Sequence, residues 1–87
     1  MKSVVITGVS SGIGFSGADI LCQAGYRVYG SVRKEDAAKP LLNKHPNNFI
    51  PLIFDVRDED AIVKAANFVE NDMSESDQFA GLVNNAG

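Results

Sequence analysis

Eight residues near the start of the chain have the side chains and spacing that a phosphate-binding turn needs. They read Thr7-Gly8-Val9-Ser10-Ser11-Gly12-Ile13-Gly14. Gly8 can adopt the positive φ of a sharp strand-to-helix turn. A side chain at Gly12 would intrude on a ligand close to the backbone, and Gly14 allows a helix to pack closely on a strand. The free N–H groups of the first helical turn would then face an anion such as pyrophosphate.

The hydroxyls of Ser10 and Ser11 can add hydrogen bonds to phosphate or ribose. The spacing Gly-x3-Gly-x-Gly differs from the commoner G-x-G-x-x-G. It also lacks the Gly-Lys-Ser/Thr ending of an ATP-binding P-loop, which argues against ATP hydrolysis. A glycine-rich turn is weak evidence by itself, because a tight strand-to-helix connection without a ligand has the same pattern.

The rest of the chain alternates short β-rich runs with helical patterns. Strands are predicted over residues 3–7, 27–32, 49–54 and 81–84, and helices over about 13–24, 35–44 and 59–73. Large and small apolar residues at helical spacing predict the buried face of the first helix: Ile13, Gly17, Ile20, Leu21 and Ala24. A second stripe does so for the third helix: Ile62, Ala65, Ala66, Val69 and Met73.

Several residues mark where the predicted helices and strands begin, end or bend. Gly25 is placed to stop the first helix, Pro40 to bend or restart the second, and Asp58 to cap the third. Pro51 predicts an edge position for the third strand, because proline cannot donate to the ladder. The order β-α-β-α-β-α-β predicts an α/β fold, with a parallel sheet and helices on both faces. In such sheets ligands bind outside the carboxyl ends of the strands, where the strand order reverses.

Three motifs resemble those of the classical short-chain dehydrogenase/reductase family. They are Thr7-Gly8-x-x-x-Gly12-Ile13-Gly14, then Asp55-Val56 after the third strand, then Asn84-Asn85-Ala86-Gly87 at the end of the fourth. They occur in the family's order and on the expected elements. The resemblance implies a Rossmann-type parallel sheet, truncated after its fourth strand, in which residues 1–87 form a partial NAD(P)-binding domain.

The resemblance also implies roles for individual residues. Asp55 would accept a hydrogen bond from the adenine amino group, with the Val56 backbone beside it. From the residues alone, Asp55 is as well explained as a helix cap or a solvated acid. Asn84 would tie the central strands together. The turn residues that would hold the pyrophosphate and its ribose are Gly8, Ser10, Ser11, Gly12, Ile13 and Gly14. The residues that would line the ribose side of the pocket are Asn85, Ala86 and Gly87.

The end of the second strand bears on the choice of cofactor. NAD-specific Rossmann domains carry an acidic residue there, which bonds the ribose 2′-hydroxyl. This chain has Val32 at that position, followed by Arg33 and Lys34. A guanidinium can bind a phosphate bidentately. The sequence therefore favours NADP(H), with NAD possible, over the alternative of a solvated basic pair that begins the next helix.

The family's catalytic Tyr-x-x-x-Lys pair is not present in these residues. Tyr26 is followed four residues later by Gly30, and Tyr29 by Arg33. We therefore name no catalytic residue, and we expect no metal site. Two interpretations remain: the N-terminal part of an NADP-dependent oxidoreductase acting on a carbonyl or alcohol, or a free-standing, non-catalytic nucleotide-binding module. The end at Gly87, inside a family motif, favours the first.

Composition excludes other classes of function. Eight Lys+Arg against eleven Asp+Glu give a net charge of −3, with no basic run for nucleic acid. No stretch approaches the ~20 apolar residues of a membrane helix. Cys22 is the only cysteine, which indicates a reducing, cytoplasmic compartment and a buried helix residue. His45 is expected in an exposed loop. An unpaired fourth strand would favour self-association.

Overall fold

The computed structural model describes residues 2–10, 12–55, 57–73 and 78–84. Its elements alternate as the sequence predicts. Along the chain they are β1 (Lys2–Thr7), α1 (Gly12–Gln23), β2 (Arg27–Val32), the 3₁₀ turn η1 (Glu35–Ala38), α2 (Lys39–Lys44), β3 (Phe49–Ile53), α3 (Glu59–Asp72) and β4 (Gln78–Asn84).

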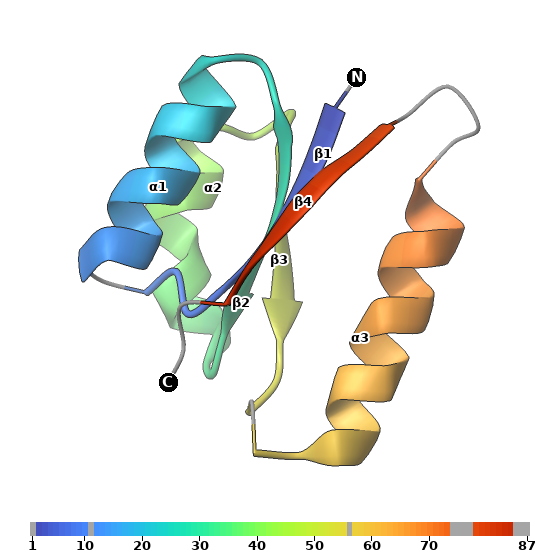
Figure 1. Ribbon diagram of the computed structural model, residues 1–87. Coiled ribbons are helices and arrows are strands. Elements are labelled where there is room, and N and C mark those ends of the chain that lie inside the picture. The colour runs from blue at the N-terminus through green and yellow to red at the C-terminus, as the bar shows by residue number, and fades with distance from the viewer. Residues whose placement is uncertain (1, 11, 56, 74–77, 85–87) are drawn as a thin grey trace.

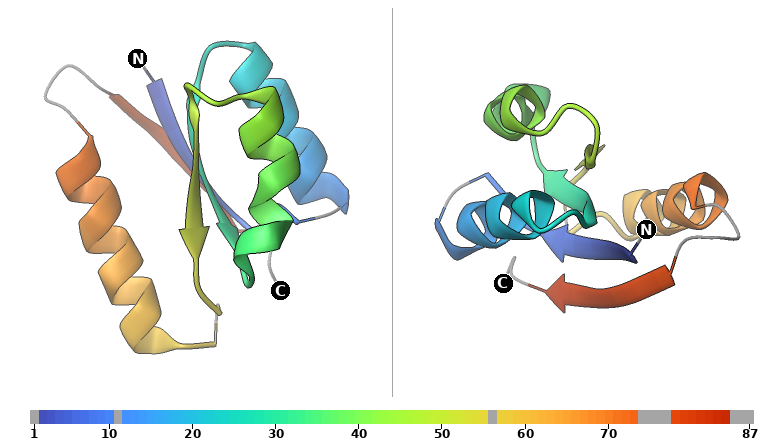
Figure 2. Two further views of the ribbon diagram at one scale, coloured as in Figure 1. Left: turned by 180° about the vertical axis from the view of Figure 1, so that it is seen from behind. Right: turned by 90° about the horizontal axis from the view of Figure 1, so that it is seen from above.

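The described strands form one parallel sheet in the order β3-β2-β1-β4. The chain builds outward from β1 to β3, then crosses to the other side of β1 to form β4. Helices α1 and α2 cover one face of the sheet and α3 lies against the other (Figures 1 and 2). The predicted fold class is confirmed. The edge position predicted from Pro51 is also confirmed, because β3 is an outer strand of the described sheet.

The sheet has a separate apolar cluster on each face. Under α1 and α2, the buried core includes Ile6, Val28 and Leu41. Under α3 a smaller cluster centres on Tyr29, Leu52 and Val69. The Tyr29 hydroxyl donates to Asp72 Oδ2 at 2.8 Å, which ties α3 to β2. Burial of the ring, followed by the bond to Asp72, raises the pKa of Tyr29 to about 12, so the phenol stays protonated.

The predicted buried face of α1 is wrong at its two isoleucines. Ile13 and Ile20 are 84% and 63% exposed. The residues that face the sheet are instead small: Gly14, Ala18 and Cys22. Small side chains spaced four residues apart occupy the buried positions of the helix, and the two isoleucines point outward. Leu21, which is also predicted to face the core, does pack against it, as does Phe15. Cys22 is buried, as expected, and desolvation raises the pKa of its thiol to about 11.

The predicted helix boundaries agree with the structure. Gly25 has φ +92°, and the Gly25 and Tyr26 N–H groups donate to the Cys22 and Leu21 carbonyls, as in a Schellman motif. Pro40 lies in the first turn of α2, where it restarts the helix after η1. The Asp58 carboxylate caps α3 by accepting from the backbone N–H of Ala61 at 3.2 Å.

The prediction of an exposed His45 is wrong. Its side chain is 12% exposed, and Nε2 lies 2.7 Å from Asp19 Oδ1. Lys44 Nζ lies 3.0 Å from the other oxygen of Asp19. This Asp19 cluster (Asp19, Lys44 and His45) joins α1 to the end of α2. Its hydrogen bonds, from His45 first and then Lys44, lower the pKa of Asp19 to about 2.

Among the helices described, none is long and apolar enough to cross a bilayer.

Candidate functional site

The candidate site lies at the carboxyl edge of the sheet, where β1 gives way to the glycine turn. There the strand order reverses between β1 and β4, whose last described pair is Thr7 with Asn84. The Thr7 hydroxyl donates to the Val83 carbonyl at 3.4 Å, which joins these two strand ends. A reversal point of this kind leaves a crevice between the loops that follow the two strands, and ligands of open α/β sheets bind there.

The backbone of the turn has the conformation that its glycines predict. Gly8 has φ +73° and Gly12 has φ +63°, in the left-handed region that favours glycine. A Cβ at Gly12 would meet no other part of the protein within 4 Å. A glycine is therefore favoured at this position by the positive φ, and it also leaves the adjacent space open to a ligand. Gly14 is buried against the sheet. The first turn of α1 contains no acidic residue, which leaves the positive end of the helix dipole available to an anion.

Two residues of β2 support the turn from below, and the sequence reasoning missed both. The buried Ser31 accepts a hydrogen bond from the Gly8 N–H at its Oγ (2.8 Å) and one from the Val9 N–H at its carbonyl (3.0 Å). Gly30 lies under the fully buried Val9, and a Cβ there would come within 2.8 Å of Val9 Cγ2. A serine and a glycine inside a strand give no periodic signal, so only the fold reveals these contacts.

The end of β2 is basic, as the sequence indicates. Val32 is 2% exposed and packs in the core under α1 and α2. Arg33 follows with a side chain that is 71% exposed. Lys34 is exposed and extended, and it precedes η1 without capping it through its side chain. Arg33 is not simply solvated, because its Nη2 lies 3.5 Å from Asp55 Oδ2 at the end of the neighbouring strand.

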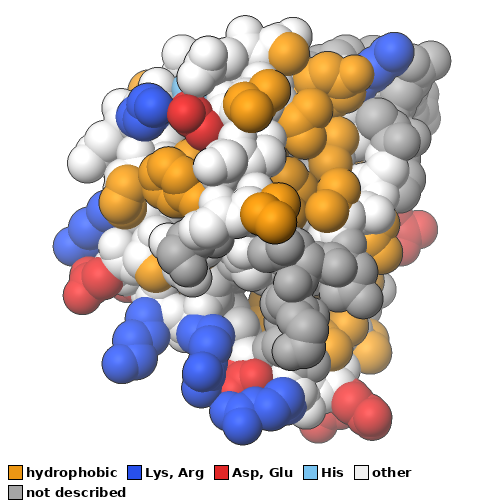
Figure 3. Space-filling view, turned by 60° about the vertical axis from the view of Figure 1, so that its left-hand side comes forward, with side chains coloured by type: hydrophobic (Ala, Val, Ile, Leu, Met, Phe, Trp, Pro, Cys, Tyr) orange, Lys and Arg blue, Asp and Glu red, His pale blue; other side chains and the backbone are white. Residues whose placement is uncertain are grey.

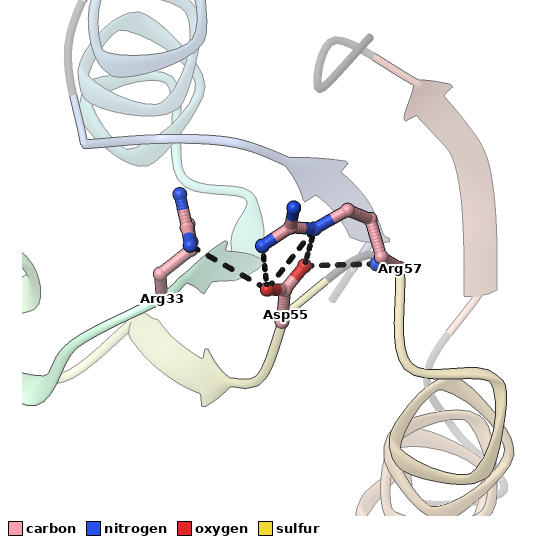
Figure 4. Close-up of polar contacts among 3 residues, drawn as sticks. All are labelled: Arg33, Asp55 and Arg57. Carbon is pink, nitrogen blue, oxygen red and sulfur yellow. Dashed lines mark hydrogen bonds and ion pairs between the residues drawn. The ribbon is translucent and has the colours of Figure 1, made fainter.

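Asp55 is held by a second arginine that the sequence analysis did not consider (Figure 4). Arg57 donates to Asp55 Oδ1 from its backbone N–H at 2.9 Å and from Nε at 3.1 Å. Its Nη2 donates to Oδ2 at 2.7 Å. The guanidinium and backbone of Arg57, with a smaller effect of Arg33, hold the pKa of Asp55 well below its usual range. Asp55 is therefore an ionised, ordered acceptor and does not cap α3, since Asp58 does so.

Lys and Arg side chains gather at the end of the molecule toward which the strands run, with an acidic side chain between them (Figure 3). Gly8, Ser10, Gly12, Ile13 and Gly14 lie at that same end. The remaining residues of the predicted site lie outside the described part of the structure: Ser11, Val56, Asn85, Ala86 and Gly87.

The chemistry of these donors fits a dinucleotide phosphate. Two glycines in left-handed conformations open the backbone to a pyrophosphate. Ser10 adds an exposed hydroxyl beside them. The guanidinium groups of Arg33 and Arg57 share the single carboxylate of Asp55, so this corner carries a net positive charge that suits a second phosphate group.

The chain matches the short chain dehydrogenase family over residues 2–87 and belongs to that family. Among its relatives, it is 41% identical to the "NADPH-dependent 3-dehydrocapnine reductase" of Ornithobacterium rhinotracheale, over all of this chain and 30% of that protein. It is 38% identical to a "Probable NADP-dependent dehydrogenase" of Haemophilus influenzae, over 98% of this chain and 32% of that one. The chain therefore spans about a third of the length of these relatives.

Solved structures show the same arrangement of elements. A short-chain dehydrogenase/reductase from Saccharomyces cerevisiae is 30% identical, with a TM-score of 0.86 over 100% of this chain and 34% of that one. A short-chain dehydrogenase from Bacillus anthracis is 28% identical, with a TM-score of 0.86 over 99% of this chain and 35% of that one.

Proposed function

We propose that residues 1–87 are the NADP(H)-binding portion of a short-chain dehydrogenase/reductase that transfers hydride between the nicotinamide and a carbonyl or alcohol substrate. One observation carries the choice of cofactor. The strand end where NAD-specific domains place a carboxylate has the buried Val32, followed by the exposed Arg33. The relatives named as NADPH-dependent or NADP-dependent support this choice.

Each part of the site has a separate task in this proposal. The helix N-terminus and the glycine turn hold the pyrophosphate, Asp55 holds the adenine amino group, and Arg33 with Lys34 binds the 2′-phosphate. The nicotinamide, when bound, supplies or accepts the hydride. The residues that would hold the pyrophosphate and its ribose are Gly8, Ser10, Ser11, Gly12, Ile13 and Gly14. The family resemblance assigns Val56 to the adenine, and Asn85, Ala86 and Gly87 to the ribose side of the pocket.

The test is a calorimetric titration of the wild-type protein and Arg33→Ala with NADPH and with NADH. A charge-assisted hydrogen bond contributes roughly 1.5–3 kcal/mol, and the exposure of Arg33 favours the lower value. We therefore expect wild type to prefer NADPH by about tenfold or more, and the variant to lose most of that preference. The mutation is made at Arg33 because an acidic residue at Val32 would place a charge in the apolar core.

The matched control is Lys64→Ala, which removes one exposed positive charge from α3. It should leave the ratio of the two affinities unchanged. Equal affinity of the wild type for NADPH and NADH would refute the cofactor assignment. If the folded wild type binds neither NADPH nor NADH, the proposed function is refuted.

A further inference from the structure

Asp55 sits between two arginines that bind it very unequally. Arg57 makes a bidentate contact through its side chain, with Nη2 at 2.7 Å from Oδ2 and Nε at 3.1 Å from Oδ1, and adds its backbone N–H. Arg33 makes a single longer contact, at 3.5 Å. Arg57 is only two positions from Asp55, so this contact needs little ordering of the chain. Arg57 therefore occupies the carboxylate while Arg33 remains at its margin (Figure 4).

The charges of this corner depend on that unequal sharing. One carboxylate and two guanidinium groups leave one positive charge in excess. Without the Arg57 side chain, Asp55 would face Arg33 as its remaining cation. The two would then form a neutral pair, since Arg33 already lies within ion-pair distance. A neutral pair attracts a phosphate far less than an unpaired guanidinium does, and the carboxylate itself repels it.

We propose that Arg57 is a positioning residue for cofactor specificity: by occupying Asp55, it leaves Arg33 available to the 2′-phosphate of NADP(H). This inference rests on the proposed NADP(H) function. It differs from a direct role, in which Arg57 itself contacts the phosphate. The two roles can be separated experimentally. If Arg57 acts only by occupying Asp55, then removing the negative charge of Asp55 makes Arg57 unnecessary. If Arg57 contacts the phosphate directly, removing that charge does not compensate for the loss of Arg57.

The experiment compares the ratio of NADPH to NADH affinity in wild type, Arg57→Ala, Asp55→Asn and the double variant, by calorimetric titration at fixed low salt. Exposed ion pairs contribute up to about 1 kcal/mol, so Arg57→Ala should lower the ratio by about fivefold. Adding Asp55→Asn to Arg57→Ala should restore the ratio, because Arg33 then has no carboxylate to pair with. Any weakening of adenine binding by Asp55→Asn affects both cofactors equally and cancels in the ratio.

Two further measurements separate positioning from general damage. Arg57→Lys should give an intermediate ratio, because an ammonium cannot reproduce the bidentate contact. Raising the salt concentration should reduce the difference in the NADPH-to-NADH affinity ratio between wild type and Arg57→Ala, since salt screens exposed charges. Lys64→Ala again serves as the charge-matched control.

The outcomes distinguish this inference from the proposed function. If wild type prefers NADPH and Arg57→Ala keeps that preference, the inference is overturned and the function stands. If Arg57→Ala loses the preference and Asp55→Asn does not restore it, Arg57 acts on the phosphate directly, and the positioning role is overturned. If the folded wild type binds neither cofactor, the proposed function fails, and the inference fails with it.

Discussion

Gly30, in the middle of β2, supports both the core and the glycine turn, and a single methyl group there should disturb both. A Cβ at this position would lie 2.6 Å from Phe49 Cε1 and 2.8 Å from Val9 Cγ2. Phe49 is 2% exposed and Val9 is fully buried, so neither side chain has free space to enter. Because Val9 belongs to the turn, the displacement would be transmitted to the predicted phosphate site.

Overpacking of a filled core costs about 1–3 kcal/mol. We expect Gly30→Ala to lower the free energy of unfolding by that amount, and each kcal/mol should lower Tm by about 4–8 °C for a domain of this size. Urea denaturation followed by circular dichroism measures the loss of stability. Cofactor titration, under conditions where the variant is folded, measures the disturbance of the glycine turn, and it should show weaker binding of both NADPH and NADH.

Gly17→Ala is the matched control, because Gly17 lies inside α1 and a Cβ there would meet nothing within 4 Å. It should stabilise the protein by about 0.5–1 kcal/mol. Replacing Phe49 by Leu in the Gly30→Ala background should recover part of the loss, so the two mutations would not be additive. An unfolding free energy for Gly30→Ala within about 0.3 kcal/mol of wild type, with unchanged cofactor affinity, would refute the reasoning.

Three other outcomes are expected. The pKa of Asp19 is lowered to about 2, so its contribution to stability is present above pH 4 and is lost as the pH falls toward 2. In urea titrations, the free energy of unfolding should therefore fall more steeply with decreasing pH in wild type than in Asp19→Asn. Asp58→Ala removes the cap of α3 and should cost about 1 kcal/mol, measured in the same assay. Leu82 and Val83 are 62% and 47% exposed on an outer strand of the described sheet. A polypeptide of these 87 residues should therefore self-associate through that strand. A concentration-independent monomer in analytical sedimentation would contradict this.

The order of elements and the position of the glycine turn could be predicted because their signals are local. Glycines at fixed spacing, an aspartate cap at Asp58 and a proline in an outer strand each constrain the backbone within a few residues. The orientation of α1 could not be predicted in this way. Hydrophobicity ranks Ile13 and Ile20 above Ala18, yet the smaller residue occupies the buried position of the helix.

The polar partners of the site were harder to predict, because they depend on which strands become neighbours. Ser31 bonds to Gly8 across two parallel strands, 23 residues apart in sequence. Arg33 reaches Asp55 because β2 and β3 end side by side. Arg57 is close to Asp55 in sequence, but a single arginine after a strand has no distinctive pattern. These contacts follow from the parallel register and not from residue types alone.

NADPH binding at the glycine turn is tested most directly by an amide chemical-shift titration of the ¹⁵N-labelled protein. We predict saturable shifts for the amides of Gly8, Gly12 and Arg33 at the carboxyl edge of the sheet. The amide of Asn48, which precedes β3 at the opposite edge, should stay unchanged. Saturable binding that shifts Asn48 and its neighbours but leaves the glycine turn unperturbed would show that NADPH binds elsewhere on the protein.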